Sequence, residues 1–174
     1  MSYRKGNKQE CDVCDTDVHF VLVTQSHNKP STKCERGWQQ HRGVCYLFST
    51  NGMSWKNSRY FCQRQGGDLV KINSREEQSF LEYQLRNEMN FDDDKFWIGL
   101  TDSEQEGRWL WMDGSELDTS LAFWSRREPD DWKAKGSDGE DCASMGERAG
   151  AEDLKCWFDR PCYMDQSIIS EKPA

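Results

Sequence analysis

Carboxylates are concentrated in EPDDW at residues 128–132, in GEDC at residues 139–142 and in WFD at residues 157–159. Calcium prefers roughly six to eight oxygen ligands at about 2.3–2.6 Å, and loop carboxylates supply them without strict geometry. Pro129 stands between two carboxylates, and because proline fixes its own φ it aims its neighbours at one point. A cis Glu128–Pro129 bond would do this best, since cis peptide bonds are nearly confined to proline. The sequence therefore predicts a calcium site on loops.

The charge and the cysteine content of the chain narrow its class. The 174 residues carry a formal net charge of −8, and the isoelectric point is near 5.0. This balance argues against nucleic acid or an anionic membrane as a main partner, since both favour clustered lysine and arginine. Eight cysteines in a tryptophan-rich chain indicate an oxidising compartment, so we expect an extracellular protein.

The side chains that catalysis requires do not form a motif. His19, His27 and His41 all precede the acidic stretches and have no Ser, Cys or Asp companion in a catalytic pattern. The sequence also contains no Gly-rich phosphate loop. Paired carboxylates can serve a glycosidase, but calcium binding accounts for them better. We therefore expect a protein that is not an enzyme.

The first 32 residues differ in composition from the rest of the chain. They are polar and charged and include Asn28-Lys29-Pro30, which is typical of a stalk or leader. We therefore expect a stalk at residues 1–32 and a compact domain at residues 33–174. The apolar run at residues 18–23 is far too short to cross a bilayer, and the first ten residues do not resemble a signal peptide. We expect a secreted protein or the ectodomain of a membrane protein.

Two helices are predicted in the first half of the domain. Residues 54–65 place apolar and small side chains on one face at helical spacing, and Gly66-Gly67 ends the helix. Ser74 and Glu77 form a capping box, which predicts a second helix to about residue 88. The strands of this half are expected in a hairpin at residues 34–48, which turns at residues 41–43, and at residues 68–72.

Strands dominate the second half of the domain. The apolar residues 96–100 predict a central strand, and Trp109 and Trp111 alternate in the next one. The long irregular stretch before Cys142 is expected to be functional, because loops of this length inside a compact domain usually are. Further short strands are expected at residues 142–145, 154–158 and 166–169, and the core is expected to hold Trp97, Trp109, Trp111 and Trp157. The pattern as a whole predicts an α+β fold.

Several spaced motifs agree in order with one family. They are GDLV at residues 67–70, WIGL at residues 97–100, EGRW at residues 106–109, and the three acidic stretches. With these motifs the chain resembles the C-type lectin-like domain, in its long form, from Cys34 to the C-terminus. The resemblance implies a disulfide-stapled fold of two helices and antiparallel strands with a long calcium-binding loop.

The resemblance also implies two calcium sites. The auxiliary site would be formed by Asp102, Glu106, Asp131, Glu140 and Asp141, and every one of these positions holds a carboxylate. The principal site would be formed by Glu128, Asp130, Glu140 and Asp159. Its remaining position, usually Asn in the family, is Phe158, so one oxygen ligand is missing. The residues expected to contact sugar are Glu128, Asp130, Trp132, Glu140, Phe158 and Asp159.

The departures from the family pattern affect how a sugar would be held. Family members bind vicinal sugar hydroxyls on the ion, and amide groups of the site orient the sugar. Asp130 and Phe158 replace two asparagines, and carboxylates only accept hydrogen bonds. At about 0.5–1.5 kcal/mol for each hydrogen bond, the loss weakens sugar binding by roughly 1–3 kcal/mol. Glu128 favours mannose or fucose, whereas Asp130 followed by an aromatic platform at Trp132 keeps galactose open.

Two functions follow from the resemblance. The first is a calcium-dependent carbohydrate-binding domain of a receptor or secreted lectin, in innate immunity or cell-surface glycan recognition. The second is a lectin-like receptor that binds a protein ligand, with calcium structural or absent. Phe158 favours the second function, since an exposed aromatic in a binding loop suits protein contacts.

The cysteines follow the family pattern only in part. The resemblance implies the disulfides Cys34–Cys45 and Cys142–Cys162, but the usual partner of Cys62 is replaced by Ser170. Cys156 is an extra cysteine that either pairs with Cys62 or stays free, which geometry must decide. Cys11 and Cys14, in the predicted stalk, indicate a disulfide-linked homodimer, with closure of a small local loop as the alternative.

Overall fold

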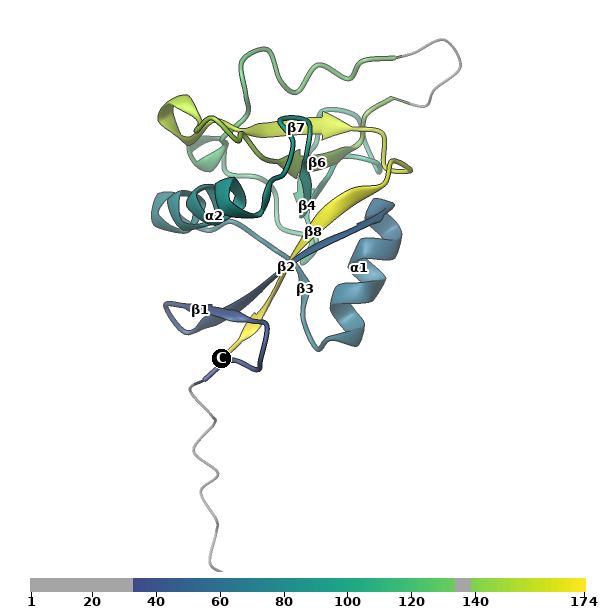
Figure 1. The fold of residues 1–174 in the computed structure, drawn as a ribbon. Helices are drawn as coiled ribbons and strands as arrows, with labels where there is room; N and C mark the ends of the chain where they lie inside the picture. Colours follow the sequence, from purple (N-terminus) through teal and green to yellow (C-terminus); the bar gives the residue numbers. More distant parts are fainter. Residues whose placement is uncertain (1–32, 134–138) are drawn as a thin grey trace, which may run out of the picture.

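The computed structural model describes residues 33–133 and 139–174. The described residues form an eight-stranded sheet and two helices (Figure 1). The strands are β1 (Gln39–His41), β2 (Val44–Met53), β3 (Asp68–Leu69), β4 (Phe96–Thr101), β5 (Leu110–Trp111), β6 (Cys142–Met145), β7 (Trp157–Arg160) and β8 (Gln166–Pro173). The helices are α1 (Trp55–Arg64) and α2 (Arg75–Glu88), and the 3₁₀ turns are η1 (Thr119–Leu121) and η2 (Glu152–Leu154). The α+β prediction is confirmed, while the predicted stalk, with Cys11 and Cys14, lies outside the described residues.

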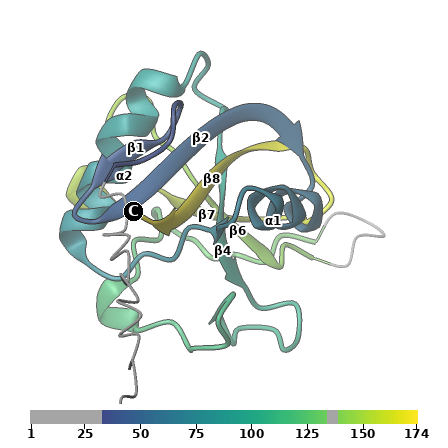
Figure 2. The same ribbon diagram turned by 90° about the horizontal axis from the view of Figure 1, so that it is seen from below.

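The sheet is mixed rather than wholly antiparallel. Its strands follow the order β1-β2-β8-β4-β6-β7, with β3 paired to β8 and β5 to β4. The pair β4 and β8 is parallel, with Phe96 opposite Ser167 and Trp97 opposite Ile168. The two helices lie on opposite sides of the β2–β8 pair, as both views show (Figures 1 and 2). Strands β6 and β7 lie at the far end of the molecule from the C-terminus (Figure 1).

The predicted capping box begins α2 and also joins the helix to the sheet. Ser74 Oγ accepts a hydrogen bond from the Glu77 backbone N–H at 3.1 Å. Glu77 Oε2 accepts from the Asn73 N–H at 2.8 Å, and Glu77 Oε1 accepts from the Tyr46 hydroxyl in β2 at 2.6 Å. Glu77 therefore accepts one hydrogen bond at the start of α2 and another from β2, which joins the helix to that strand.

No helix among the described residues is long and apolar enough to span a bilayer.

The four tryptophans expected in the core are buried there. Trp97 and Trp157 are fully buried, and Trp109 and Trp111 nearly so. A buried indole needs a hydrogen-bond acceptor, and both fully buried rings have one. Trp97 Nε1 donates to the Met53 carbonyl at 2.8 Å, and Trp157 Nε1 donates to Gln78 Oε1 in α2 at 3.0 Å.

Some strand boundaries differ from those predicted. The strand expected at residues 154–158 is wrong in its first half, because Asp153 and Leu154 have φ of 53° and 63°. A left-handed backbone cannot belong to an extended strand, so Leu154 lies in η2 and β7 starts at Trp157. Trp109 precedes β5 rather than lying in it, β3 ends at Leu69, and β8 extends to Pro173.

The cysteines within residues 33–133 and 139–174 form two disulfides and leave two free thiols. The structure contains the disulfides Cys34–Cys45 and Cys142–Cys162. Cys62 and Cys156 are free and fully buried, and they belong to separate apolar clusters. Of the two alternatives for Cys156, the structure therefore shows the free thiol. Burial raises the pKa of the Cys62 thiol to about 11, and the Ser170 hydroxyl lowers the pKa against this effect.

Candidate calcium and sugar site

The backbone around residue 128 is bent in a way that turns carboxylates inward. The Glu128–Pro129 bond is cis, as the sequence predicts, and Arg127 and Asp131 have φ of 77° and 43°. A Cβ on Gly139 would lie 2.3 Å from Asp131 Oδ1, so a side chain at this position would displace the Asp131 carboxylate. Glycine at residue 139 therefore keeps room for that carboxylate.

Three of the predicted principal ligands converge. Glu128, Asp130 and Asp159 each offer a carboxylate oxygen, and these oxygens lie within 4.8 Å of one another. Asp159 comes from β7 and is fully buried. It accepts the backbone N–H of Asp130 at 3.2 Å and that of Asp131 at 2.7 Å. The β7 carboxylate therefore holds the loop that carries the other two groups.

The fourth predicted principal ligand, Glu140, lies beside this cluster but not within it. Its side chain is buried, and Oε2 accepts the Trp132 N–H at 3.3 Å. Burial, and then the charge of Asp159, raises the pKa of Glu140 to about 7. Burial and then the contact with Asp159 raise the pKa of Glu128 to about 8. A bound divalent cation would favour the ionised carboxylates and relieve this crowding.

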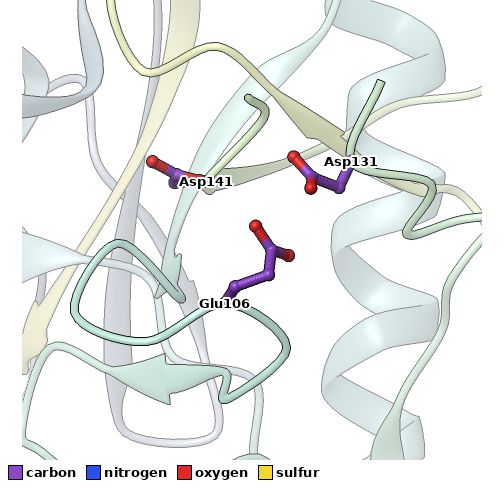
Figure 3. A group of neighbouring side chains, drawn as sticks. All are labelled: Glu106, Asp131 and Asp141. Atoms are coloured by element: carbon purple, nitrogen blue, oxygen red, sulfur yellow. The ribbon is translucent and has the colours of Figure 1, made fainter. Parts of the chain in front are cut away.

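A second cluster joins three of the predicted auxiliary ligands. Oxygens of Glu106, Asp131 and Asp141 lie within 4.8 Å of one another. Figure 3 shows these side chains pointing toward one another from three separate segments. Asp102 lies outside the three-residue cluster, where its Oδ2 accepts the Gly107 N–H at 2.8 Å. The structure thus brings together three of the five predicted auxiliary residues.

Two buried carboxylate oxygens test whether the residues of the predicted sites fit a cation. Asp102 Oδ1 and Glu128 Oε2 are shielded from solvent and have no hydrogen-bond partner among residues 33–133 and 139–174. A buried carboxylate oxygen without a partner is costly. One such oxygen belongs to each predicted site, so the residues present fit a calcium ion at both.

A sequence model of the Lectin C-type domain matches residues 51–172. The chain belongs to the C-type lectin domain family. It is 36% identical to the hepatic lectin of Gallus gallus over 138 residues, which are 79% of this chain and 59% of that protein. It is 40% identical to C-type lectin domain family 10 member A of Homo sapiens over 125 residues, or 70% of this chain and 37% of that protein. The lectin domain therefore spans about a third to three fifths of these relatives.

Solved structures agree with the fold of this lectin domain. The carbohydrate-recognition domain of the mouse scavenger receptor C-type lectin aligns with a TM-score of 0.69 at 34% identity, covering 81% of this chain and 98% of that one. The type II antifreeze protein of herring aligns with a TM-score of 0.63 at 31% identity, covering 81% and 99%. The two-helix, disulfide-stapled C-type lectin fold predicted from the motifs is confirmed. Members of this family are not enzymes, which agrees with the expectation from the sequence.

The two aromatic residues of the predicted sugar site have different surroundings in this lectin domain. The Trp132 side chain is on the acidic loop, where the residue is 62% exposed, and the backbone N–H of Trp132 donates to Asp130 Oδ1 at 3.2 Å. Phe158 is half-buried, and its ring centroid lies 5.0 Å from Lys95 Nζ and 5.1 Å from Arg160 Cζ. Trp132 is thus free to stack on a ligand. Phe158 lies in β7, half-buried and close to two cations, so it is not the exposed loop aromatic that the sequence predicted.

Sequence reasoning missed the cations beside the acidic clusters. Arg160 directly follows the WFD motif, and its Nη1 donates to the Asp159 carbonyl at 2.8 Å. The charge of Arg160 lowers the pKa of both Glu128 and Glu140, against the larger effect of burial. Lys133 lies one residue beyond EPDDW, and its ammonium approaches Asp131. Proximity in sequence to the acidic motifs was the available signal for both residues.

Proposed function

We propose that this domain binds carbohydrate through a calcium ion at the principal site, held by Glu128, Asp130, Glu140 and Asp159. The observation that carries the proposal is the convergence of three loop and strand carboxylates within 4.8 Å. Calcium accepts such oxygens, and its remaining coordination positions would bind two neighbouring hydroxyls of a terminal sugar. The auxiliary site would hold a second ion that fixes the long loop.

The sugar class follows from the residues around the principal ion. Glu128 favours mannose, fucose and related sugars, because it matches the mannose-type form of the family motif. Trp132 supports galactose as the alternative, since its 62% exposed indole offers an apolar face for stacking. Relatives of known structure support glycan binding in general: the domain of murine dendritic cell inhibitory receptor 2, at 26% identity and a TM-score of 0.67, was solved with an N-glycan.

The decisive experiment uses the purified domain, multimerised and applied to an array of mannose-, fucose- and galactose-terminated glycans. The array is run with calcium and again with a chelator. Binding that requires calcium is the expected result, and the terminal sugar retained identifies the class. Absence of binding under both conditions, from a folded sample, would contradict the proposal.

A second candidate function is recognition of a protein ligand, with calcium structural or absent. Phe158 is the observation that favours it, because an aromatic side chain replaces an oxygen ligand at the edge of the principal site. The family also contains a calcium-independent type II antifreeze protein, at 27% identity and a TM-score of 0.62. Its existence shows that the fold persists without calcium in at least one relative.

Replacing Phe158 by asparagine separates these functions. In a sugar-binding site, Phe158→Asn restores one oxygen ligand and one amide donor, so we expect glycan affinity to rise by about twofold to tenfold. Phe158→Ala is the matched control, because it removes the ring without adding an amide. Glycan binding is measured by calorimetry at saturating calcium. Equal affinities for the two variants would favour the protein-binding function.

The relatives are lectins by name, and two proteins of similar structure are named as receptors. We infer an extracellular location, as a secreted lectin or an ectodomain, with a role in innate immune or cell-surface glycan recognition. The lectin domain would span residues 33–174, after a stalk at residues 1–32.

Cys11 and Cys14 would join two chains in the proposed stalk, so the protein should migrate as a dimer on a non-reducing gel. Unchanged mobility after reduction would contradict the dimer.

A further inference from the structure

The auxiliary cluster already contains a positive charge supplied by the chain. Lys133 Nζ lies 2.8 Å from Asp131 Oδ2 and 3.9 Å from Glu106 Oε2. The ammonium group therefore pairs with two of the three carboxylates that line the cluster.

The backbone at Gly139 leaves space for the Lys133 side chain to fold back toward Asp131. A Cβ on Gly139 would lie 3.2 Å from Lys133 Cε and 2.3 Å from Asp131 Oδ1. Gly139 has φ of 105°, a backbone region that side-chain-bearing residues rarely adopt. Because residue 139 has no side chain, the Lys133 stem and the Asp131 carboxylate can lie close to its backbone.

An ammonium group and a calcium ion cannot share these carboxylates. Asp131 and Glu106 are both predicted calcium ligands, and Asp131 makes its 2.8 Å contact with Lys133 through Oδ2. A divalent ion among the same oxygens would repel the nearby ammonium. Calcium binding at this site therefore requires Lys133 to swing away and lose its contacts.

We propose that Lys133 is a built-in competitor of calcium at the auxiliary site, which neutralises the cluster in the absence of the ion and sets how much calcium is needed to replace it. The side chains of Lys133 and Glu106 are more than half exposed, and exposed ion pairs are weak. The lysine is therefore displaced at a higher calcium concentration rather than excluding the ion altogether. This inference rests on the calcium sites of the proposed function but concerns the auxiliary site alone.

The test compares calcium binding by the wild-type chain and three variants. Lys133→Met removes the charge and keeps most of the stem, Lys133→Arg keeps the charge, and Lys56→Met makes the same charge change on an exposed part of α1. Each variant is made in a Glu128→Gln background as well, because Glu128 belongs to the predicted principal site alone, so that the remaining calorimetric signal comes from the auxiliary site. Thermal unfolding is followed in chelator and in saturating calcium.

We expect Lys133→Met to tighten auxiliary calcium binding by about threefold to thirtyfold, the range set by losing two weak ion pairs. Lys133→Arg and Lys56→Met should stay within about twofold of the wild type. Lys133→Met should also lower the unfolding temperature in chelator and have no effect in saturating calcium. Unchanged calcium affinity in Lys133→Met, or no calcium binding by any variant, would overturn the inference.

The outcomes separate this inference from the proposed function. If Lys133→Met tightens calcium binding while the glycan array shows no binding, the carbohydrate function fails and the role of Lys133 stands. If the array shows calcium-dependent binding while Lys133→Met leaves calcium affinity unchanged, the role of Lys133 fails alone.

Discussion

Ser170→Cys is expected to form a disulfide with Cys62 and to raise the free energy of unfolding by about 3 kcal/mol. Cys62 lies on α1 and Ser170 on β8, both are fully buried, and the Ser170 hydroxyl is near enough to lower the pKa of the Cys62 thiol against the larger effect of burial. The bond would close a loop with a sequence separation of 108, from 170 minus 62. A loop of about 100 residues corresponds to roughly 4.7 kcal/mol of lost chain entropy.

Part of this gain is offset by a lost hydrogen bond. Ser170 Oγ donates to the Asp68 carbonyl at 3.2 Å, and a disulfide sulfur cannot replace that donor. Leaving that buried carbonyl without its donor costs about 1–2 kcal/mol, which brings the net gain to about 3 kcal/mol. The measurement is guanidinium-induced unfolding, run once without and once with a reductant. The reductant is chosen so that it cannot reach buried disulfides until the chain unfolds.

The control for the disulfide is the double variant Cys62→Ser with Ser170→Cys. It contains the new cysteine but no partner for it, so its stability should lie at or below that of the wild type. A stability gain of the same size in the double variant would show that the new thiol acts by packing alone. A free-thiol assay on the denatured single variant counts the cysteines that remain unpaired.

Asp159→Asn is expected to abolish calcium-dependent glycan binding, with a loss of at least about a hundredfold. Asp159 serves the principal site twice, as a ligand in the cluster with Glu128 and Asp130, and as the acceptor of the Asp130 and Asp131 N–H groups. Asparagine removes the charge and keeps only one acceptor oxygen. Residues that merely orient metal ligands often change affinity by about 10–100-fold when replaced, so a residue that does both should have at least that effect.

The measurement is glycan binding across a calcium titration, because a weakened site should recover part of its binding at high calcium. Asp93→Asn is the matched control, since it makes the same chemical change at an exposed position outside both clusters. Circular dichroism checks that Asp159→Asn is folded. Glycan binding that persists unchanged in Asp159→Asn would show that the ion is not held at this cluster.

Local patterns made much of the fold predictable. The capping box at Ser74 and Glu77 marks the start of α2, because its hydrogen bonds join residues three or four apart. The cis Glu128–Pro129 bond follows from the chemistry of proline. The start of β7 was predicted wrongly because Asp153 and Leu154 have a left-handed backbone although neither is a glycine, so the sequence contains no signal for it.

The candidate site was predictable as a set of residues but not as a geometry. The motifs placed carboxylates at the family positions, and the structure brings Glu128, Asp130 and Asp159 together while leaving Glu140 beside them. Asp159 is 29 residues from Asp130, and their contact depends on how the long loop packs against β7. No local spacing encodes that contact.

By itself, then, the sequence determined the fold family, the two helices, the acidic loop and the absence of a cysteine opposite Cys62, since these depend on residue identity and short-range periodicity. Only the tertiary structure decided that Cys62 and Cys156 stay apart, that Phe158 lies close to Lys95 and Arg160, and that Lys133 pairs with Asp131 of the auxiliary cluster. The physical reason is that charge pairing and burial act through space. Side chains that are far apart in the sequence, or that fold back toward a neighbouring residue, come into contact only after the sheet and its loops have packed.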